Sequence, residues 1–272
     1  MLMAEIMDRL TRNEIAMAFG AVALEAGKAI MAARIASSEV RQKADGSPVT
    51  KADLDADSII RARLPGIMPD VPVVSEEMAE MRRDALPSRF ILVDPLDGTR
   101  EYTAGRDEFT VNIALIDDRQ PVAGTVYAPA LGQLYVGGDQ ALRAEVRPDE
   151  PLPRAETMRR LRTSPVPGEG LRAVASRSHL DPATKQWLDD QHIVELRSAG
   201  SSLKFCVIAE GEADVYPRFG PTMEWDTAAG HAVLRAAGGC VLGLDGSPIS
   251  YGKTDVGFRN NSFIAWGQAP RR

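Results

Sequence analysis

The chain has 272 residues, of which 44% are hydrophobic and 26% are charged, and its formal net charge is −6. This length permits a sizeable core, and the composition is that of an ordinary globular protein. The negative charge argues against a general affinity for nucleic acid polymers or anionic membranes. The N-terminus carries acids and a base early, and no apolar run approaches a membrane span in length. We therefore expect no signal peptide and no transmembrane segment, and a cytoplasmic protein.

Two segments in the N-terminal part of the chain are predicted to be helical. Apolar side chains recur at helical spacing between residues 5 and 35, which favours one or two amphipathic helices. Thr50 can cap a second helix. We expect that helix to end at Leu64, because Pro65 and Gly66 follow.

Three acids near the start of the second helix have different interpretations. Asp53 and Asp57 share a face because they lie four residues apart, whereas Asp55 points elsewhere. Acids near a helix N-terminus usually complement the helix dipole, and this is our interpretation of Asp55 and Asp57. Asp53 remains a candidate site residue.

Two short apolar segments are each followed by carboxylates. These are residues 71–75, followed by Glu76 and Glu77, and residues 90–93, followed by Asp94 and Asp97. Both segments are typical of strands, and the second is apolar enough to be buried on both faces. If the two strands are neighbours, a glutamate would lie beside the aspartates. Because an unpaired buried carboxylate loses its hydration, the pattern predicts a cation here, with a hard divalent metal as the natural candidate.

The segment around the aspartates has a second interpretation. Asp, Pro and Gly each suit a tight turn, so the run from Asp94 to Gly98 is also compatible with turn chemistry alone. Pro95 should end the strand ladder. In the site interpretation, the backbone amides of Gly98 and Thr99 begin a short helix and face a phosphate. Further carboxylates elsewhere in the chain favour a metal-assisted phosphate site.

The rest of the chain is predicted to form paired strands and then an α/β alternation. Residues 109–116 and 121–127 are typical of paired strands, with another strand at 134–138. The proline-rich, charged stretch 147–170 marks a boundary between one unit at 1–148 and a second at 149–272. In the second unit we expect strands at 171–176, 192–197, 213–216 and 241–242, and helices at 182–190, 201–210 and 225–237.

Asp226 and His179 are the last candidates. Asp226 precedes an Ala-rich helix, where a capping role is usual, and it becomes a metal ligand only if the fold brings it to the aspartate pair. His179 lies just past a predicted strand, where α/β proteins bind ligands.

Four segments together resemble the inositol monophosphatase-like, lithium-sensitive phosphatase superfamily. In chain order they contain Asp53, Ser75-Glu76-Glu77, Asp94-Pro95-Leu96-Asp97-Gly98-Thr99 and Trp225-Asp226-Thr227-Ala228-Ala229. The resemblance covers nearly the whole chain. Within the superfamily the chain is most similar to the bacterial CysQ group of 3′(2′),5′-bisphosphate nucleotidases, through Thr99-Arg100-Glu101-Tyr102, Ser176-Arg177-Ser178-His179 and Gly200-Ser201-Ser202-Leu203-Lys204.

This resemblance implies a fold and a set of site residues. The fold would be a layered α-β-α-β-α sandwich of the α/β (α+β) class, with the site between the two units. Two or three Mg²⁺ ions would be held by Glu76, Asp94, the Leu96 carbonyl, Asp97 and Asp226. Asp53, Glu76 and Thr99 would orient the attacking water.

On the substrate side, the resemblance places Ser176 and His179 near the ribose or base. It places Gly200 and Lys204 near the 5′-phosphate, and Arg218 would add positive charge there. The phosphate to be removed would contact Glu76, Leu96, Asp97, Gly98, Thr99 and Asp226.

The implied activity is Mg²⁺-dependent hydrolysis of the 3′-phosphate of adenosine 3′,5′-bisphosphate to AMP and phosphate, which clears a by-product of sulfate activation. One alternative is an inositol-1-phosphate or sugar-phosphate phosphatase with the same metal site, against which Arg100-Glu101-Tyr102 argues. The other is a non-catalytic protein that binds metal and nucleotide. We expect a monomer or homodimer, and a peripheral association with the inner membrane stays open.

Overall fold

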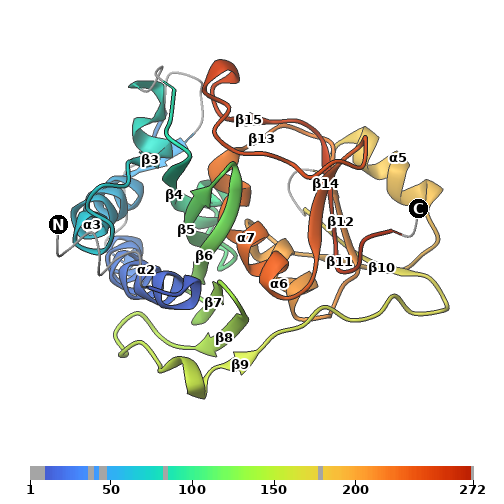
Figure 1. Ribbon diagram of the computed structural model, residues 1–272, viewed down its shortest axis with the longest axis horizontal. Helices are drawn as coiled ribbons and strands as arrows, with labels where there is room; N and C mark the ends of the chain where they lie inside the picture. Colours follow the sequence, from blue (N-terminus) through green and yellow to red (C-terminus); the bar gives the residue numbers. More distant parts are fainter. Residues whose placement is uncertain (1–9, 36–39, 43–47, 82–84, 177–179, 271–272) are drawn as a thin grey trace.

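The computed structural model describes residues 10–35, 40–42, 48–81, 85–176 and 180–270. Five layers follow one another from left to right in Figure 1. They are helices α2 (Arg12–Ile35) and α3 (Lys51–Ile67), a seven-stranded sheet, helices α6 (Leu203–Ala209) and α7 (Glu224–Ala236), a five-stranded sheet, and helix α5 (Pro182–Asp190). This order confirms the predicted α-β-α-β-α sandwich.

The seven-stranded sheet is antiparallel except for its first pair. In spatial order it contains β3 (Val73–Ser75), β4 (Arg89–Asp97), β5 (Thr110–Asp117), β6 (Gln120–Ala128), β7 (Gln133–Gly137), β8 (Ala141–Glu145) and β9 (Arg159–Arg160). Strands β3 and β4 are parallel, with Ser75 opposite Val93, so both carboxyl ends lie at one edge as predicted. Strand β9 still pairs with β8, so the chain leaves this sheet only beyond the proposed division at residues 148 and 149.

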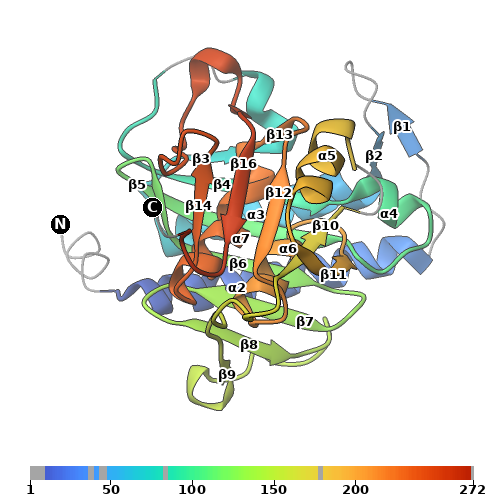
Figure 2. The ribbon, with the colours of Figure 1, turned by 90° about the vertical axis from the view of Figure 1, so that its right-hand side faces the viewer.

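The five-stranded sheet faces the viewer in Figure 2 and carries α5 beside it. In spatial order it contains β11 (Ile193–Ser198), β10 (Leu171–Ala175), β12 (Val215–Arg218), β16 (Phe263–Trp266) and β14 (Cys240–Gly243). Strand β10 is parallel to β11 and β12, whereas β16 is antiparallel to β12 and β14. The predicted α/β alternation of the second half is therefore confirmed.

Shorter elements complete the described structure. They are the antiparallel pairs β1 (Val40–Gln42) with β2 (Pro48–Thr50) and β13 (Thr222–Met223) with β15 (Arg259–Asn260), the short helix α4 (Thr99–Thr103), and the 3-10 helices η1 (Glu76–Met81), η2 (Ala155–Thr157) and η3 (Thr254–Val256).

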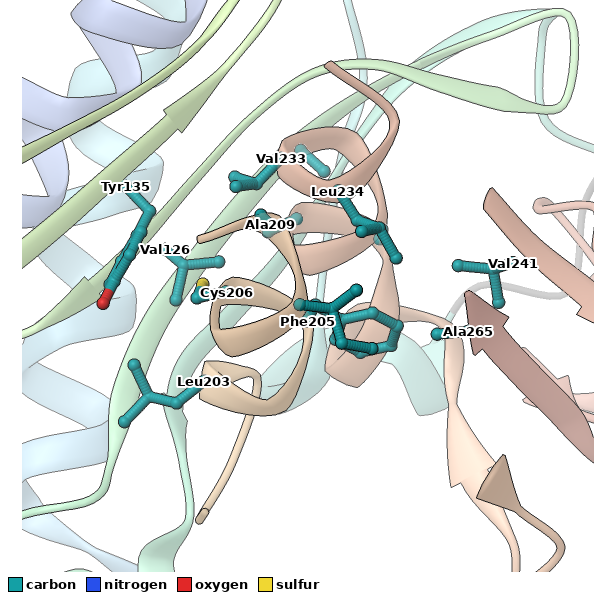
Figure 3. Close-up of a cluster of buried hydrophobic side chains, with 14 of the residues drawn as sticks. Val126, Tyr135, Leu203, Phe205, Cys206, Ala209, Val233, Leu234, Val241 and Ala265 are labelled. Atoms are coloured by element: carbon teal, nitrogen blue, oxygen red, sulfur yellow. The ribbon is translucent and has the colours of Figure 1, made fainter. Parts of the chain in front are cut away.

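Helices α6 and α7 fill the space between the two sheets, and one apolar core runs through them (Figure 3). Val126 contributes from the first sheet, Phe205 from α6 and Val241 from the second sheet. Helix α7 lies close to the first sheet. Gly137 permits this approach, since a Cβ atom there would lie only 2.5 Å from the Cα of Val233. The two sheets thus share one middle layer.

Helix α2 covers the outer face of the seven-stranded sheet together with α3 (Figure 1). Its side chains Ile15, Phe19 and Ile30 are buried, which confirms the predicted apolar face. By length and composition alone, α2 is the one described helix that could cross a membrane, so the expectation that no apolar run is long enough was wrong. Just over half of that apolar stretch, 56%, is buried inside the protein, so its contacts are those of a core helix.

Helix α3 begins where predicted and ends later. Thr50 is its N-cap and forms a capping box with Asp53. The helix continues to Ile67 with Pro65 inside its last turn, so the predicted end at Leu64 was wrong. Pro65 removes one N–H donor, but the turn that follows it still closes, because the N–H of Met68 donates to the Leu64 carbonyl at 2.8 Å.

Candidate active site

A cavity of about 600 Å³ brings together site candidates from distant parts of the chain. The predicted carboxylates that line it are Glu76, Asp94, Asp97 and Asp226, and the predicted cations are Lys204 and Arg218; Arg100, Glu101 and Asp181 line it as well. Four further predicted residues line it, namely Leu96, Gly98, Thr99 and Ser176. The predicted convergence of α7 with the aspartate segment is therefore present.

The parallel pair β3 and β4 positions the first two carboxylates. Glu76 begins η1 directly after β3, and Asp94 lies in β4, 2% exposed, where its Oδ1 accepts the N–H of Leu96 at 3.0 Å. The prediction that Pro95 ends the strand was wrong. Strand β4 continues to Asp97 with a shift of register, because the proline lacks an N–H and a bulge absorbs the missing bond.

Gly98 lets the chain turn sharply into α4. Its φ of 91° favours glycine, and a Cβ atom there would lie 2.3 Å from the Oγ of Ser201. The next residue, Thr99, has its hydroxyl 3.2 Å from Oδ1 of Asp53 and 3.2 Å from the Leu96 carbonyl. The turn thus aligns a hydroxyl between two acceptors.

Asp53 reaches this turn from helix α3. Its Oδ2 accepts the N–H of Thr50 at 2.8 Å and the Thr50 hydroxyl at 2.6 Å, and its Oδ1 is left to Thr99. Burial raises the pKa of Asp53, although these hydrogen bonds and the Thr99 contact lower it in part. The acidic residue of the α3 capping box therefore also orients the Thr99 hydroxyl.

Asp226 is the third residue of α7 and not its N-cap, which is Met223. One carboxylate oxygen of Asp226 accepts the N–H of Met223 at 2.8 Å. Loss of hydration raises its pKa well above the usual value, and the negative charge of Asp97 adds to the effect. The pKa of Asp97 is also raised, chiefly by loss of hydration, while the charge of Lys204 lowers it.

Asn112 and Ser202 hold the two aspartates in place, and the sequence reasoning missed both. The amide Nδ2 of Asn112 donates to the Ser202 hydroxyl at 2.7 Å and to Oδ2 of Asp97 at 3.3 Å. The Ser202 hydroxyl lies 3.1 Å from Oδ2 of Asp97 and 2.9 Å from the backbone carbonyl of Asp226. An asparagine inside the apolar strand 110–117 was a usable signal, because a buried amide needs partners.

Asp57 was also misinterpreted as a residue that only complements the helix dipole. It is 4% exposed, and its Oδ1 accepts the hydroxyl of Ser75 at 2.5 Å. Its Oδ2 accepts from Nε of Arg61 at 2.7 Å. Asp57 therefore fixes the residue that directly precedes Glu76.

Lys204 is a buried cation and not the solvated helix lysine that its position suggests. Its Nζ donates to the Ser201 carbonyl at 2.6 Å and lies 5.3 Å from the centre of the Tyr216 ring. Burial lowers its pKa to about 8, although the nearby charge of Asp97 opposes this. Arg218 lies at the end of β12 and lines the same cavity.

Two predicted substrate residues have a different outcome. Gly200 is not among the residues that line the cavity, and a Cβ atom there would lie 2.6 Å from the carbonyl oxygen of Glu108. Its small size is thus explained by a close backbone approach. His179 lies outside the described residues.

The oxygen donors of the cavity fit a hard divalent cation. Carboxylates and the Leu96 carbonyl are ligands that Mg²⁺ prefers. A cation among them would also relieve the repulsion and lost hydration that raise the pKa values of Asp97 and Asp226. No three histidine, cysteine, aspartate or glutamate side chains of the described residues form a ready-made ligand shell, so the full ligand set stays a prediction.

Comparison with known proteins places this chain in one family. The chain belongs to the inositol monophosphatase family, whose model matches residues 11–269. One relative is the 3′(2′),5′-bisphosphate nucleotidase CysQ of Escherichia coli K12, 45% identical over 216 residues that cover 78% of this chain and 83% of the relative. The CysQ of Buchnera aphidicola is 39% identical over 231 residues, 83% of each chain.

A solved structure extends the similarity over almost the whole chain. The crystal structure of CysQ from Bacteroides thetaiotaomicron, a bacterial member of the same family, is 39% identical, with a TM-score of 0.80. The match covers 96% of this chain and 98% of that one. The resemblance to the CysQ group is thus confirmed.

Proposed function

We propose that this chain is a Mg²⁺-dependent phosphomonoesterase that removes the 3′-phosphate of adenosine 3′,5′-bisphosphate, giving AMP and phosphate. The observation that carries the proposal is one cavity that combines the carboxylates of Glu76, Asp94, Asp97 and Asp226 with the cations Lys204 and Arg218. A bisphosphate has two anionic groups, which need two kinds of partner: a metal for the group that is hydrolysed and cations for the group that stays. The relatives named as bisphosphate nucleotidases support the same substrate class.

Residues of the chain would hold both metal and water. Glu76, Asp94, the Leu96 carbonyl, Asp97 and Asp226 would bind two or three Mg²⁺ ions, which fits the metal dependence of the family. When bound, Mg²⁺ supplies activation of a water molecule and stabilisation of the leaving oxygen.

Thr99 and Asp53 act on the water from the protein side. When the Thr99 hydroxyl donates a hydrogen bond to Asp53, with 3.2 Å between the two oxygens, its lone pairs can accept a hydrogen bond from water. Asp53 is held by Thr50 and so keeps that hydroxyl in one orientation. Glu76 would accept the second hydrogen bond of the same water.

The cationic end of the cavity would bind the 5′ side of the nucleotide. Lys204 and Arg218 would contact the 5′-phosphate, with Gly200 nearby through its backbone, and Ser176 and His179 would contact the ribose or base. We place the enzyme in the cytoplasm, where it would clear the by-product of sulfate activation.

The test is phosphate release by the purified protein with Mg²⁺ from adenosine 3′,5′-bisphosphate, inositol 1-phosphate and fructose 1,6-bisphosphate, with lithium in a parallel set. We expect preference for the nucleotide and inhibition by millimolar lithium. Preference for inositol 1-phosphate would refute the substrate assignment and keep the metal site. Bound metal without release from any ester would favour a non-catalytic binder.

A variant tested in parallel distinguishes an enzyme from a non-catalytic binding protein. The Asp94→Ala change should reduce turnover above all, whereas in a binder it would chiefly reduce ligand affinity.

A further inference from the structure

The segment 218–222 forms one wall of the cavity. Arg218, Gly220, Pro221 and Thr222 of this segment all line the cavity. Within the segment, one guanidinium nitrogen of Arg218 donates to the Pro221 carbonyl at 3.0 Å. The backbone course of this segment therefore determines where the Arg218 charge lies.

The wall is held by the first turn of helix α5, where Asp181 also lines the cavity and Thr184 does not. Asp181, the N-cap of α5, accepts the N–H of Gly220 at 3.0 Å through Oδ2. The same oxygen accepts the hydroxyl of Thr184 at 2.6 Å, and that hydroxyl accepts the N–H of Phe219 at 3.1 Å. Two successive backbone N–H groups of the wall are thus bound by one side-chain pair, which we call the Asp181–Thr184 brace.

The brace is rigid at both of its members. Thr184 is 3% exposed, and Oδ1 of Asp181 also accepts the N–H of Thr184 at 3.0 Å, so the carboxylate is fixed to the helix. Helix α5 packs on the five-stranded sheet through Leu188 and Val215, so the brace is anchored in the core. Thr184 does not line the cavity and has no access to a bound substrate.

We propose that the Asp181–Thr184 brace is a positioning device for substrate selectivity: it sets the wall 218–222 at the distance from the carboxylates that suits a nucleoside bisphosphate. This inference rests on the proposed function and deepens it. Without the brace, the N–H groups of Phe219 and Gly220 lose their acceptors and the wall, with Arg218, leaves its position. Contacts to the part of the substrate remote from the scissile phosphate weaken, while the carboxylate end is unaffected.

Thr184 offers a matched pair of variants. Thr184→Val has nearly the same shape but lacks the hydroxyl, and Thr184→Ser keeps the hydroxyl. For Thr184→Val we expect KM for adenosine 3′,5′-bisphosphate to rise roughly fivefold, as for the loss of a hydrogen bond, with kcat within about twofold. Hydrolysis of glycerol 2-phosphate, which is too small to reach the wall, should stay unchanged. Thr184→Ser should restore the wild-type KM.

Amide hydrogen exchange gives a second readout that does not depend on turnover. The amides of Phe219 and Gly220 should exchange faster in Thr184→Val and in Asp181→Ala than in the wild type, and Thr184→Ser should retain protection. A wild type that prefers the bisphosphate, together with a Thr184→Val variant of unchanged KM, would overturn the inference alone. Equal losses on both esters would also overturn it, since they indicate general damage. A wild type that rejects the bisphosphate would instead overturn the proposed function, and nucleotide selectivity with it.

Discussion

Asp97 and Asp226 lose hydration in the cavity, and their negative charges repel each other. The loss of hydration raises the pKa of both carboxyl groups, and the charge of Asp97 adds to the rise at Asp226. Carboxylates whose pKa is raised in the folded state lower stability at neutral pH, because the unfolded chain ionises them more easily. The arrangement is therefore unfavourable for folding by itself and suits a site built for a cation.

Replacement of Asp226 by asparagine should separate these two effects. The Asn oxygen can still accept the N–H of Met223, and the repulsion with Asp97 disappears. In EDTA we expect a Tm equal to or above that of the wild type, with kcat at least roughly a hundredfold lower in Mg²⁺. Thermal melts with and without Mg²⁺ check this, and equal stabilisation of both proteins by Mg²⁺ would contradict the ligand role.

Ser202 is the contact shared by Asn112, Asp97 and the Asp226 backbone. Ser202→Ala should raise the Mg²⁺ concentration for half-maximal activity roughly tenfold, because residues that orient ligands affect metal affinity on that scale. Ser247→Ala is the control, because it removes an exposed hydroxyl that donates to Asp245. Identical Mg²⁺ titrations for both variants would refute the positioning role.

At the scale of elements, α7 carries Asp226 at its start, and an ion pair anchors that start. Glu224 is fully buried and accepts the N–H of Gly252 at 2.6 Å and the N–H of Lys253 at 2.9 Å. Its Oε1 also pairs with Nζ of Lys253 at 2.7 Å. The beginning of α7 is thus tied to the loop before η3.

Loss of the contacts of Glu224 should lower the stability of the protein. Glu224→Ala leaves the Lys253 charge and two N–H groups without their partner, so we expect the free energy of unfolding to fall by roughly 3–5 kcal/mol. Urea denaturation measures this free energy of unfolding. Glu195→Ala, in an exposed pair with Arg197, should change it by less than about 1 kcal/mol, and similar losses in both would contradict the assignment.

Elements whose signals are local could be predicted from the sequence, and features that depend on distant partners could not. Helix α5 was predicted with its observed bounds, and its start is fixed locally, because the Asp181 side chain caps it. At Pro65 the helix continues despite one missing N–H, and at Pro95 a bulge keeps the strand paired, and neither outcome follows from the proline alone. Asp57 and Ser202 find their partners across the fold, so no pattern in their own segments indicated their roles. The metal ligands and substrate contacts were suggested by family resemblance, and their assignment stays a proposal.

At the scale of the molecule, His231 links stability to pH. It is buried in α7 with Nδ1 3.0 Å from the Tyr251 hydroxyl, and burial, with the charge of Arg235, lowers its pKa to about 3. The unfolded chain takes up a proton near pH 6.5, and the folded protein does not until about pH 3. This contribution is therefore fully present above pH 6.5 and is lost as the pH falls.

Denaturation at a series of pH values checks the effect. Below about pH 6 the wild type should lose up to roughly 1.4 kcal/mol per pH unit through this group. His231→Gln should show a shallower slope, whereas His192→Gln, at an exposed position, should keep the wild-type slope. An unchanged slope in His231→Gln would contradict the linkage.

The middle layer also has a consequence for synthesis on the ribosome. Strands β5 and β6 are complete at Ala128, but α7, which covers their inner face, ends only at Ala236. At typical elongation rates the ribosome needs roughly 5 to 20 seconds to make the intervening chain. During that time the apolar face of the sheet is exposed to solvent. We therefore expect chaperones to bind nascent chains of this length and truncated products of this length to aggregate.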